Sequence, residues 1–203
     1  MKKLVLVVAL CSSVCAFGDV VDIQFSPGGD TPGNWLYDGD VTLSFTQIVD
    51  IDAVEGGTTD ALFDEWVYIP DLVFSNGYTT VTPNGPLEIK DSGGNLLLSG
   101  TLEPGDFFTV FTTAVSYTQY TNDLDVTFVN NTIGSDFLDT LSVGTKLDFN
   151  LTLQSNENFD DILGDGNEHG NGFSGSMDVI PEPATLSLLG LGGLALIRRK
   201  RRA

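Results

Sequence analysis

The densest group of oxygen-bearing side chains lies in the run 160–172, DDILGDGNEHGNG. Calcium takes six to eight oxygen ligands at about 2.3–2.6 Å, and Asp165, Asn167 and Glu168 could supply several of them together with backbone carbonyls. An EF-hand that began at Asp165 would place Ser176 where that motif requires a bidentate Glu. The run is therefore a candidate Ca²⁺ site, the only cofactor that the sequence suggests. Its composition is more typical of the alternative, a solvated Gly-rich linker.

Nucleophilic and zinc chemistry find little support in the sequence. Both cysteines, Cys11 and Cys15, fall in the N-terminal leader described below, and His169 is the only histidine. Zinc ligation by Cys and His and Cys-His catalysis are therefore excluded for the mature chain. A serine hydrolase would depend on His169, and the nearby run 172–176, GFSGS, does not match the G-x-S-x-G elbow. A carboxylate glycosidase needs just two facing acidic side chains and stays open as an alternative.

Two pairs of aromatic residues could stack on sugars. Trp35 and Tyr37 lie between Gly33-Asn34 and the run 38–40, DGD, which suggests an exposed loop. They are our candidates for carbohydrate stacking. Trp66 and Tyr68 share one parity of an expected strand and offer the same possibility less clearly. Aromatic residues at this spacing are also typical of a hydrophobic core.

The charge of the chain restricts its partners. Residues 17–180 contain 27 Asp and Glu residues against two Lys residues, Lys90 and Lys146, which gives a net charge of −25. Such a surface repels nucleic acid and anionic membranes, so neither is an expected partner. It attracts cations and keeps a β-rich exported protein in solution.

Hydrophobic and polar residues alternate in several long runs, which is the period-two pattern of half-buried antiparallel strands. The alternation is clearest in 21–26, 41–53 and 147–154. It blurs between 107 and 120, which predicts one central strand covered on both faces. The run 87–99, with the sequence DSGGN at its centre, predicts a hairpin.

These strands predict one all-β domain. They recur about every 8–15 residues without a convincing amphipathic helix between them, which indicates an antiparallel β-sandwich, with the jelly roll as one form that would fit. We place this body at residues 17–159. Residues 160–180 are either a Gly/Asn/Asp-rich linker or a final strand.

The N-terminus predicts a secretory signal peptide over residues 1–16. Lys2 and Lys3 precede an uncharged segment, 4–14, and Val14-Cys15-Ala16 offers a cleavage site after Ala16, with Gly18 as the alternative. The expected partners are the general secretion machinery and signal peptidase. Because the leader takes both cysteines with it, the mature chain forms no disulfide.

The C-terminus predicts a weak membrane anchor. Pro181-Glu182-Pro183 precede an uncharged segment, 184–197, and a basic cluster follows it: Arg198, Arg199, Lys200, Arg201 and Arg202. A helix over the 14 residues of this segment would cover about 21 Å, which is less than the ~30 Å of a bilayer core. The basic cluster would stay on the cytoplasmic side and place the body outside.

The arrangement of residues 181–203 resembles the PEP-CTERM sorting signal of Gram-negative bacteria that make extracellular polysaccharide. The resemblance implies that an exosortase, a membrane-embedded cysteine transpeptidase or protease, recognises Pro181, Glu182 and Pro183 and removes or exchanges the tail. It implies transient insertion into the inner membrane, followed by delivery to the outer surface or the extracellular, biofilm matrix. The alternative is a transmembrane anchor that is never cut.

Together these observations predict an exported, acidic β-sandwich that is not an enzyme. We expect it to act as a structural or binding component associated with extracellular polysaccharide. A calcium-dependent carbohydrate-binding module is the first alternative, and a carboxylate glycosidase is the second.

Overall fold

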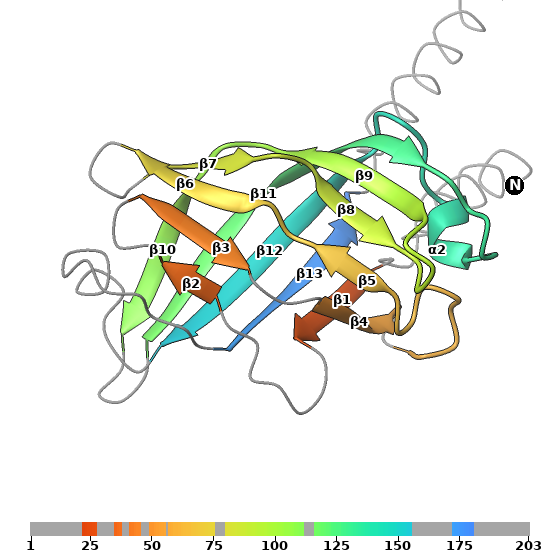
Figure 1. The fold of residues 1–203 in the computed structure, drawn as a ribbon, viewed down its shortest axis with the longest axis horizontal. Coiled ribbons are helices and arrows are strands. Elements are labelled where there is room, and N and C mark those ends of the chain that lie inside the picture. The colour runs from red at the N-terminus through yellow and green to blue at the C-terminus, as the bar shows by residue number, and fades with distance from the viewer. Residues whose placement is uncertain are drawn as a thin grey trace, which may run out of the picture. The chain divides into compact units, whose positions relative to one another are not determined.

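The computed structural model describes residues 22–27, 35–37, 41–45, 49–55, 57–75, 80–111, 116–155 and 172–180. All of these residues except Ile180 belong to one compact unit, Val21–Val179. Its described elements are thirteen antiparallel strands and one short helix (Figure 1). The strands are β1 (Asp22–Pro27), β2 (Trp35–Tyr37), β3 (Thr42–Phe45), β4 (Val49–Val54), β5 (Trp66–Tyr68), β6 (Asp71–Ser75), β7 (Thr80–Asn84), β8 (Leu87–Lys90), β9 (Leu96–Leu102), β10 (Gly105–Phe111), β11 (Ser116–Val129), β12 (Lys146–Ser155) and β13 (Phe173–Val179).

Eight of the strands close into a barrel. Their order is β12-β13-β1-β4-β5-β8-β9-β11, and β11 pairs again with β12 to complete the ring. The closing pair is the longest, since it runs in register from Ser116 opposite Ser155 to Asp125 opposite Lys146. Closure satisfies the backbone donors and acceptors of both strands, so this ring has no open edge.

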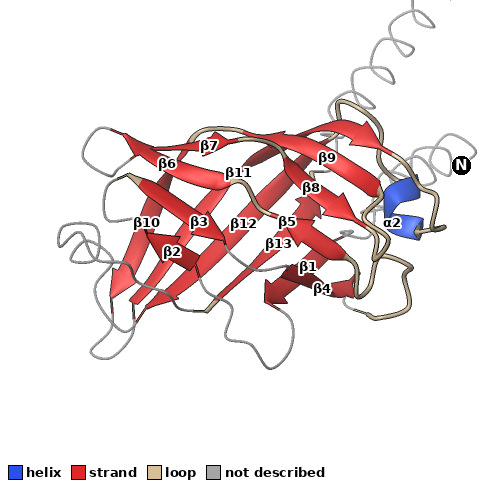
Figure 2. Cartoon of the chain, viewed as in Figure 1, coloured by secondary structure: helices blue, strands red, loops and turns tan. Residues whose placement is uncertain are grey.

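The other five strands form a branch that leaves the barrel at β11. The first half of β11, up to Tyr120, pairs with β10, whereas its second half, from Leu124, pairs with β9. The branch then continues through β7, β6 and β3 to β2. Its strands β6, β3 and β2 lie over the long strands of the barrel (Figures 1 and 2), and Phe45 of β3 meets Phe173 of β13 edge to face at 5.2 Å.

The core fills the space between these layers. Every described strand whose burial is given contributes apolar side chains to one buried cluster that joins barrel and branch. Within this cluster Phe149 is stacked on Phe25 at 5.9 Å and meets Tyr120 edge to face at 6.2 Å. The helix α2 (Asp136–Asp139) adds the buried side chains of Phe137 and Leu138 at one end of the barrel (Figure 2).

The hairpin expected over 87–99 is confirmed. Strands β8 and β9 pair from Lys90 opposite Leu96 to Leu87 opposite Gly100. The Asp91 carboxylate accepts hydrogen bonds from the backbone N–H groups of Gly93 at 2.9 Å and Asn95 at 2.8 Å. Gly94 has φ +81°, a conformation that glycine adopts without steric cost. The turn chemistry visible in the sequence therefore fixes this hairpin locally.

The prediction of one central strand over 107–120 was wrong. The segment 107–120 is two strands, β10 and β11, which pair with Phe107 opposite Tyr120 and Phe111 opposite Ser116. Two strands of opposite register in one window explain why the alternation blurs. The run 41–53 likewise divides into β3 and β4, which lie in the branch and the barrel respectively.

The all-β, antiparallel class is confirmed, but its arrangement differs from the expected sandwich. The pairing of β11 with β12 closes the ring, and period-two alternation carries no information about such closure. At the end of the stretch 160–180, Phe173–Val179 forms β13, which inserts between β12 and β1. Among the residues that the structure describes, no helix combines the length and apolar character needed to cross a membrane.

Candidate functional site

An open groove of about 340 Å³ lies on the outer face of the barrel, where β12, β13, β1 and β4 run side by side. This volume falls within the range of about 300–1,000 Å³ that is common for ligand sites. Most of its lining is polar, with two carboxylates, two carboxamides and four hydroxyl groups. The lining residues are Asp22, Gln24, Phe25, Ser26, Asp52, Asn150, Thr152, Ser174, Gly175 and Ser176.

The alternation of each strand explains the polarity of this face. Ile23 and Phe25 of β1 are buried in the core, so Gln24 between them lies on the outer side. In the same way Leu151 of β12 is buried, and its neighbours Asn150 and Thr152 line the groove. The sequence therefore sets which side chains face outward.

Pairing of distant strands aligns these side chains in rows. Ser176 of β13 lies opposite Gln24 of β1 on one side and opposite Asn150 of β12 on the other. Hydrogen bonds orient the carboxamides: Thr121 Oγ1 donates to Asn150 Oδ1 at 2.8 Å, and Gln24 Nε2 donates to Asp22 Oδ2 at 3.1 Å. The groove thus presents side chains with restricted rotamers.

A row of aspartates borders this polar row. Asp178 of β13 lies opposite both Asp22 and Asp148, and Asp148 lies opposite Asp123 of β11. The pKa of Asp178 is raised. Burial is the largest cause, and the charges of Asp22 and Asp148 add to it. Hydrogen bonds from Ser176 and Asn150 oppose this shift. Negative charge is therefore concentrated along one edge of the groove.

Gly175 allows the close packing beneath the groove. A Cβ built on this residue would overlap Phe25 Cζ and would lie 2.5 Å from the backbone carbonyl oxygen of Asn150. Real Cβ atoms do not approach backbone so closely. Glycine is therefore required for β12, β13 and the Phe25 ring to pack as they do.

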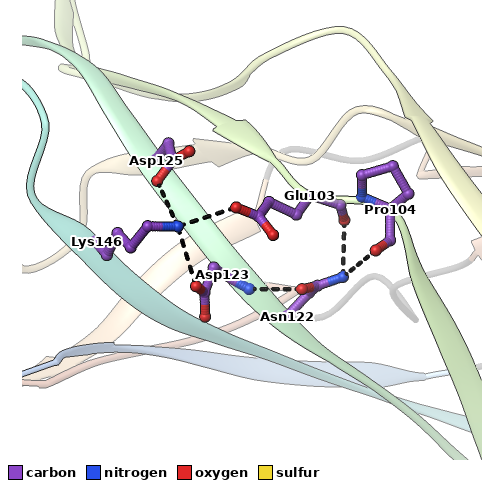
Figure 3. A network of polar contacts seen from close by, with 6 residues as sticks. All are labelled: Glu103, Pro104, Asn122, Asp123, Asp125 and Lys146. Carbon is purple, nitrogen blue, oxygen red and sulfur yellow. Dashed lines mark hydrogen bonds and ion pairs between the residues drawn. The ribbon is translucent and has the colours of Figure 1, made fainter.

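A second polar cluster surrounds Lys146, at the β11 end of the aspartate row (Figure 3). Its ammonium group lies 2.9 Å from Glu103 Oε1, 3.1 Å from Asp123 Oδ2 and 3.0 Å from Asp125 Oδ1. Hydrogen bonds to these carboxylates raise the pKa of Lys146, and the bond to Glu103 contributes most. An ammonium held protonated in this way is unsuited to nucleophilic chemistry, so we assign the cluster a structural role.

The same cluster fixes the point where the branch leaves β11. Asn122 Nδ2 donates to the Glu103 carbonyl at 2.9 Å and to the Pro104 carbonyl at 2.6 Å (Figure 3). Tyr120 Oη donates to the same Glu103 carbonyl at 2.5 Å. The Asn122 side chain occupies the place where a Cβ on Gly105 would lie. These contacts hold the corner between β9 and β10.

The aromatic platform expected at Trp35 and Tyr37 is not available in this structure. Both side chains are fully buried, and Tyr37 meets Phe74 edge to face at 6.1 Å. They belong to β2, whose short pairing with β3 directs both rings into the core. Trp66 and Tyr68 are half-buried on β5, and the Lys90 ammonium lies 4.5 Å from the Tyr68 ring centroid.

The other predicted site residues lie outside the described residues. These are the calcium candidates Asp165, Asn167 and Glu168, the sorting tripeptide Pro181-Glu182-Pro183 and the basic cluster 198–202. Within the described part of the chain, no group of three or more His, Cys, Asp or Glu side chains is placed to hold a metal ion.

Comparison with known proteins identifies the C-terminal segment. Residues 179–202 match the family model of the PEP-CTERM protein-sorting motif. The chain carries a PEP-CTERM motif. A PEP-CTERM motif marks an exported protein that an exosortase processes for the cell surface. No protein of curated function and no solved structure matches the chain.

Sequence analysis did not nominate the groove. The outward parity of Asp22, Gln24 and Asn150 was visible in the alternating runs. It was not visible that β1 and β12 flank the same strand, β13, because the partners of β1 on β13 lie more than a hundred positions away along the chain. The signal that could have found the site is the shared polar composition of the outward positions in these two runs.

Proposed function

We propose that this PEP-CTERM protein is a non-enzymatic binding component of the cell surface that attaches to extracellular polysaccharide through the outer groove. The observation that carries the proposal is the lining of the groove. Its carboxylates accept hydrogen bonds, its hydroxyl groups donate and accept, and its carboxamides do both. A polysaccharide presents hydroxyl groups that need both kinds of partner.

The shape of the site supports a polymer as ligand. The groove is open along the outer face of four adjacent strands, so a chain longer than the groove could pass through it. Contacts to polar side chains on a solvent-exposed face are individually weak. Many copies of the protein on one surface would add their contacts along a repeating ligand.

Binding is favoured over catalysis by the composition of the chain. The sequence offers no cysteine outside the leader, which excludes a Cys-His pair, and a Ser-His pair would depend on the one histidine, His169. The observation that favours a second candidate, a carboxylate glycosidase, is that Asp22 and Asp52 line the same groove. Such enzymes need only two carboxyl groups across the scissile bond.

Retention of the purified full-length chain, in mild detergent, on the producer's own polysaccharide tests the proposal. We expect Gln24→Ala combined with Asn150→Ala to reduce retention about tenfold, because both orienting carboxamides are lost. Thr101→Ala is the matched control, since Thr101 is exposed on β9 and does not line the groove. Equal retention of all three proteins would contradict the proposal. New reducing ends in the incubated polysaccharide would establish the glycosidase instead.

A further inference from the structure

The groove carries negative charge that no basic side chain of its lining offsets. Asp22 and Asp52 line it directly, and Asp178 and Asp148 continue the row from Asp22 along its border. The other lining residues are uncharged. A ligand seated in the groove therefore contacts carboxylates directly. At such short distances water and salt screen the interaction between charges least.

The two lysines of the body are engaged elsewhere. Lys90 pairs with Glu88 at 2.7 Å and lies over the Tyr68 ring. Lys146 is surrounded by three carboxylates at the far end of the aspartate row. Residues 17–180 contain no other Lys and no Arg. Within the part of the chain that the structure describes, no lysine or arginine therefore lines the groove.

This charge discriminates among polysaccharides. A uronic-acid or sulfated polymer would place its own anions against Asp22 and Asp52, where like charges repel. A neutral polymer would gain hydrogen bonds only. A polymer with free amino groups would gain hydrogen bonds in which both partners are charged, and these are about twice as strong as neutral ones.

We propose, resting on the function proposed above, that the groove selects polysaccharides carrying free amino groups, such as partly deacetylated hexosamine polymers. The hydroxyl and carboxamide groups of Ser176, Gln24 and Asn150 bind the sugar hydroxyls. The carboxylates of Asp22 and Asp52 bind the ammonium groups. Selectivity grows along the polymer, because each repeat brings another ammonium to another copy of the protein.

Binding of three oligosaccharides of equal length to the immobilised full chain tests this inference. The probes are a chitosan hexasaccharide, a fully acetylated chitin hexasaccharide and an oligogalacturonate, measured at about pH 6, where amino sugars carry a proton and aspartates in general are ionised. We expect the chitosan probe to bind at least about tenfold more tightly than the chitin probe, and the oligogalacturonate to bind least.

Charge removal in the groove provides the second arm. Asp22→Asn combined with Asp52→Asn should lower chitosan binding much more than chitin binding, so that the difference in affinity between the two probes is lost. Asp71→Asn is the matched control, because Asp71 lies on β6 and does not line the groove. A melting curve for each variant shows that loss of binding does not reflect loss of the fold.

The possible outcomes separate this inference from the proposed function. If the chitin or galacturonate probe binds as tightly as chitosan, the selectivity for amino groups is refuted while polysaccharide binding stands. If none of the three probes and no producer polysaccharide binds, both proposals fail. A pentalysine peptide is the last control. If it displaces chitosan and loses affinity equally in the double variant, the groove is a general cation site and the inference is overturned.

Discussion

Asp148 and Asp178 lie directly opposite one another across the β12–β13 pair, so two carboxylates occupy neighbouring positions on the outer face of the barrel. Directly opposed like charges destabilise an antiparallel pair. Hydrogen bonds from Asn150 and Ser176 to Asp178 relieve part of this cost. Burial and repulsion nevertheless raise the pKa of Asp178 above its usual value, and this has a consequence for stability.

The protein should become more stable as the pH falls from about 8 to about 5. The pKa of Asp178 is raised, and burial likewise raises the pKa of Asp50 and Glu65. Because these pKa values are raised in the native state, the native state binds protons before the unfolded chain does as the pH falls towards the ordinary values of 3.8 for Asp and 4.5 for Glu, so stability rises. Thermal unfolding followed by circular dichroism measures the effect.

Asp178→Asn supplies the control for this prediction. The variant keeps the size of the side chain but removes its titration, so its melting temperature should depend less steeply on pH than that of the wild type. Asp71 on β6 lies opposite Asn84 and not opposite another carboxylate. Asp71→Asn should therefore leave the pH dependence of the melting temperature unchanged. A wild-type melting temperature that is constant or rises between about pH 5 and about pH 8 would contradict the assignment.

Replacement of Gly175 by alanine should destabilise the barrel by about 1–3 kcal/mol, because the new methyl group has no room beside Phe25 and the Asn150 carbonyl. Gly172→Ala is the matched control on the same segment. A Cβ there meets nothing within 4 Å, so we expect a change within about 0.5 kcal/mol. Urea denaturation of the two variants measures both values, and equal stability would show that the strands rearrange freely.

Tyr120→Phe should cost about 0.5–1.5 kcal/mol, since it removes the hydrogen bond that ties β11 to the Glu103 carbonyl. Burial raises the pKa of Tyr120 to about 12, so native Tyr120 should stay neutral while unfolded tyrosine ionises near its ordinary value of 10.0. Stability should therefore fall as the pH rises through that interval, and less so in the variant. Ultraviolet titration detects the phenolate. Tyr68→Phe, which retains the ring beside Lys90, is the control.

Local chemistry was predictable from the sequence, and long-range pairing was not. The hairpin at Asp91–Asn95 follows from turn residues that act on their own neighbours. Trp35 is buried because β2 pairs with β3 at the end of the branch, and this pairing cannot be seen in the sequence around Trp35. Closure of the barrel and alignment of the groove require β13 to insert between β1 and β12. No periodicity in a single run encodes which strands become neighbours.

The match of residues 179–202 to the PEP-CTERM motif predicts that mature surface protein lacks the segment 184–203. Alanine in place of Pro181, Glu182 and Pro183 should favour continuation of the apolar helix backwards, since proline no longer interrupts it. Full-length protein should then accumulate in the inner membrane.

Removal of the basic cluster 198–202 should disturb processing in a different way. The short helix loses its cytoplasmic stop signal, so the chain should be released unprocessed. Mass spectrometry of the surface fraction decides the matter. Intact protein ending at Ala203 as the main surface species would show a plain anchor rather than a sorting signal.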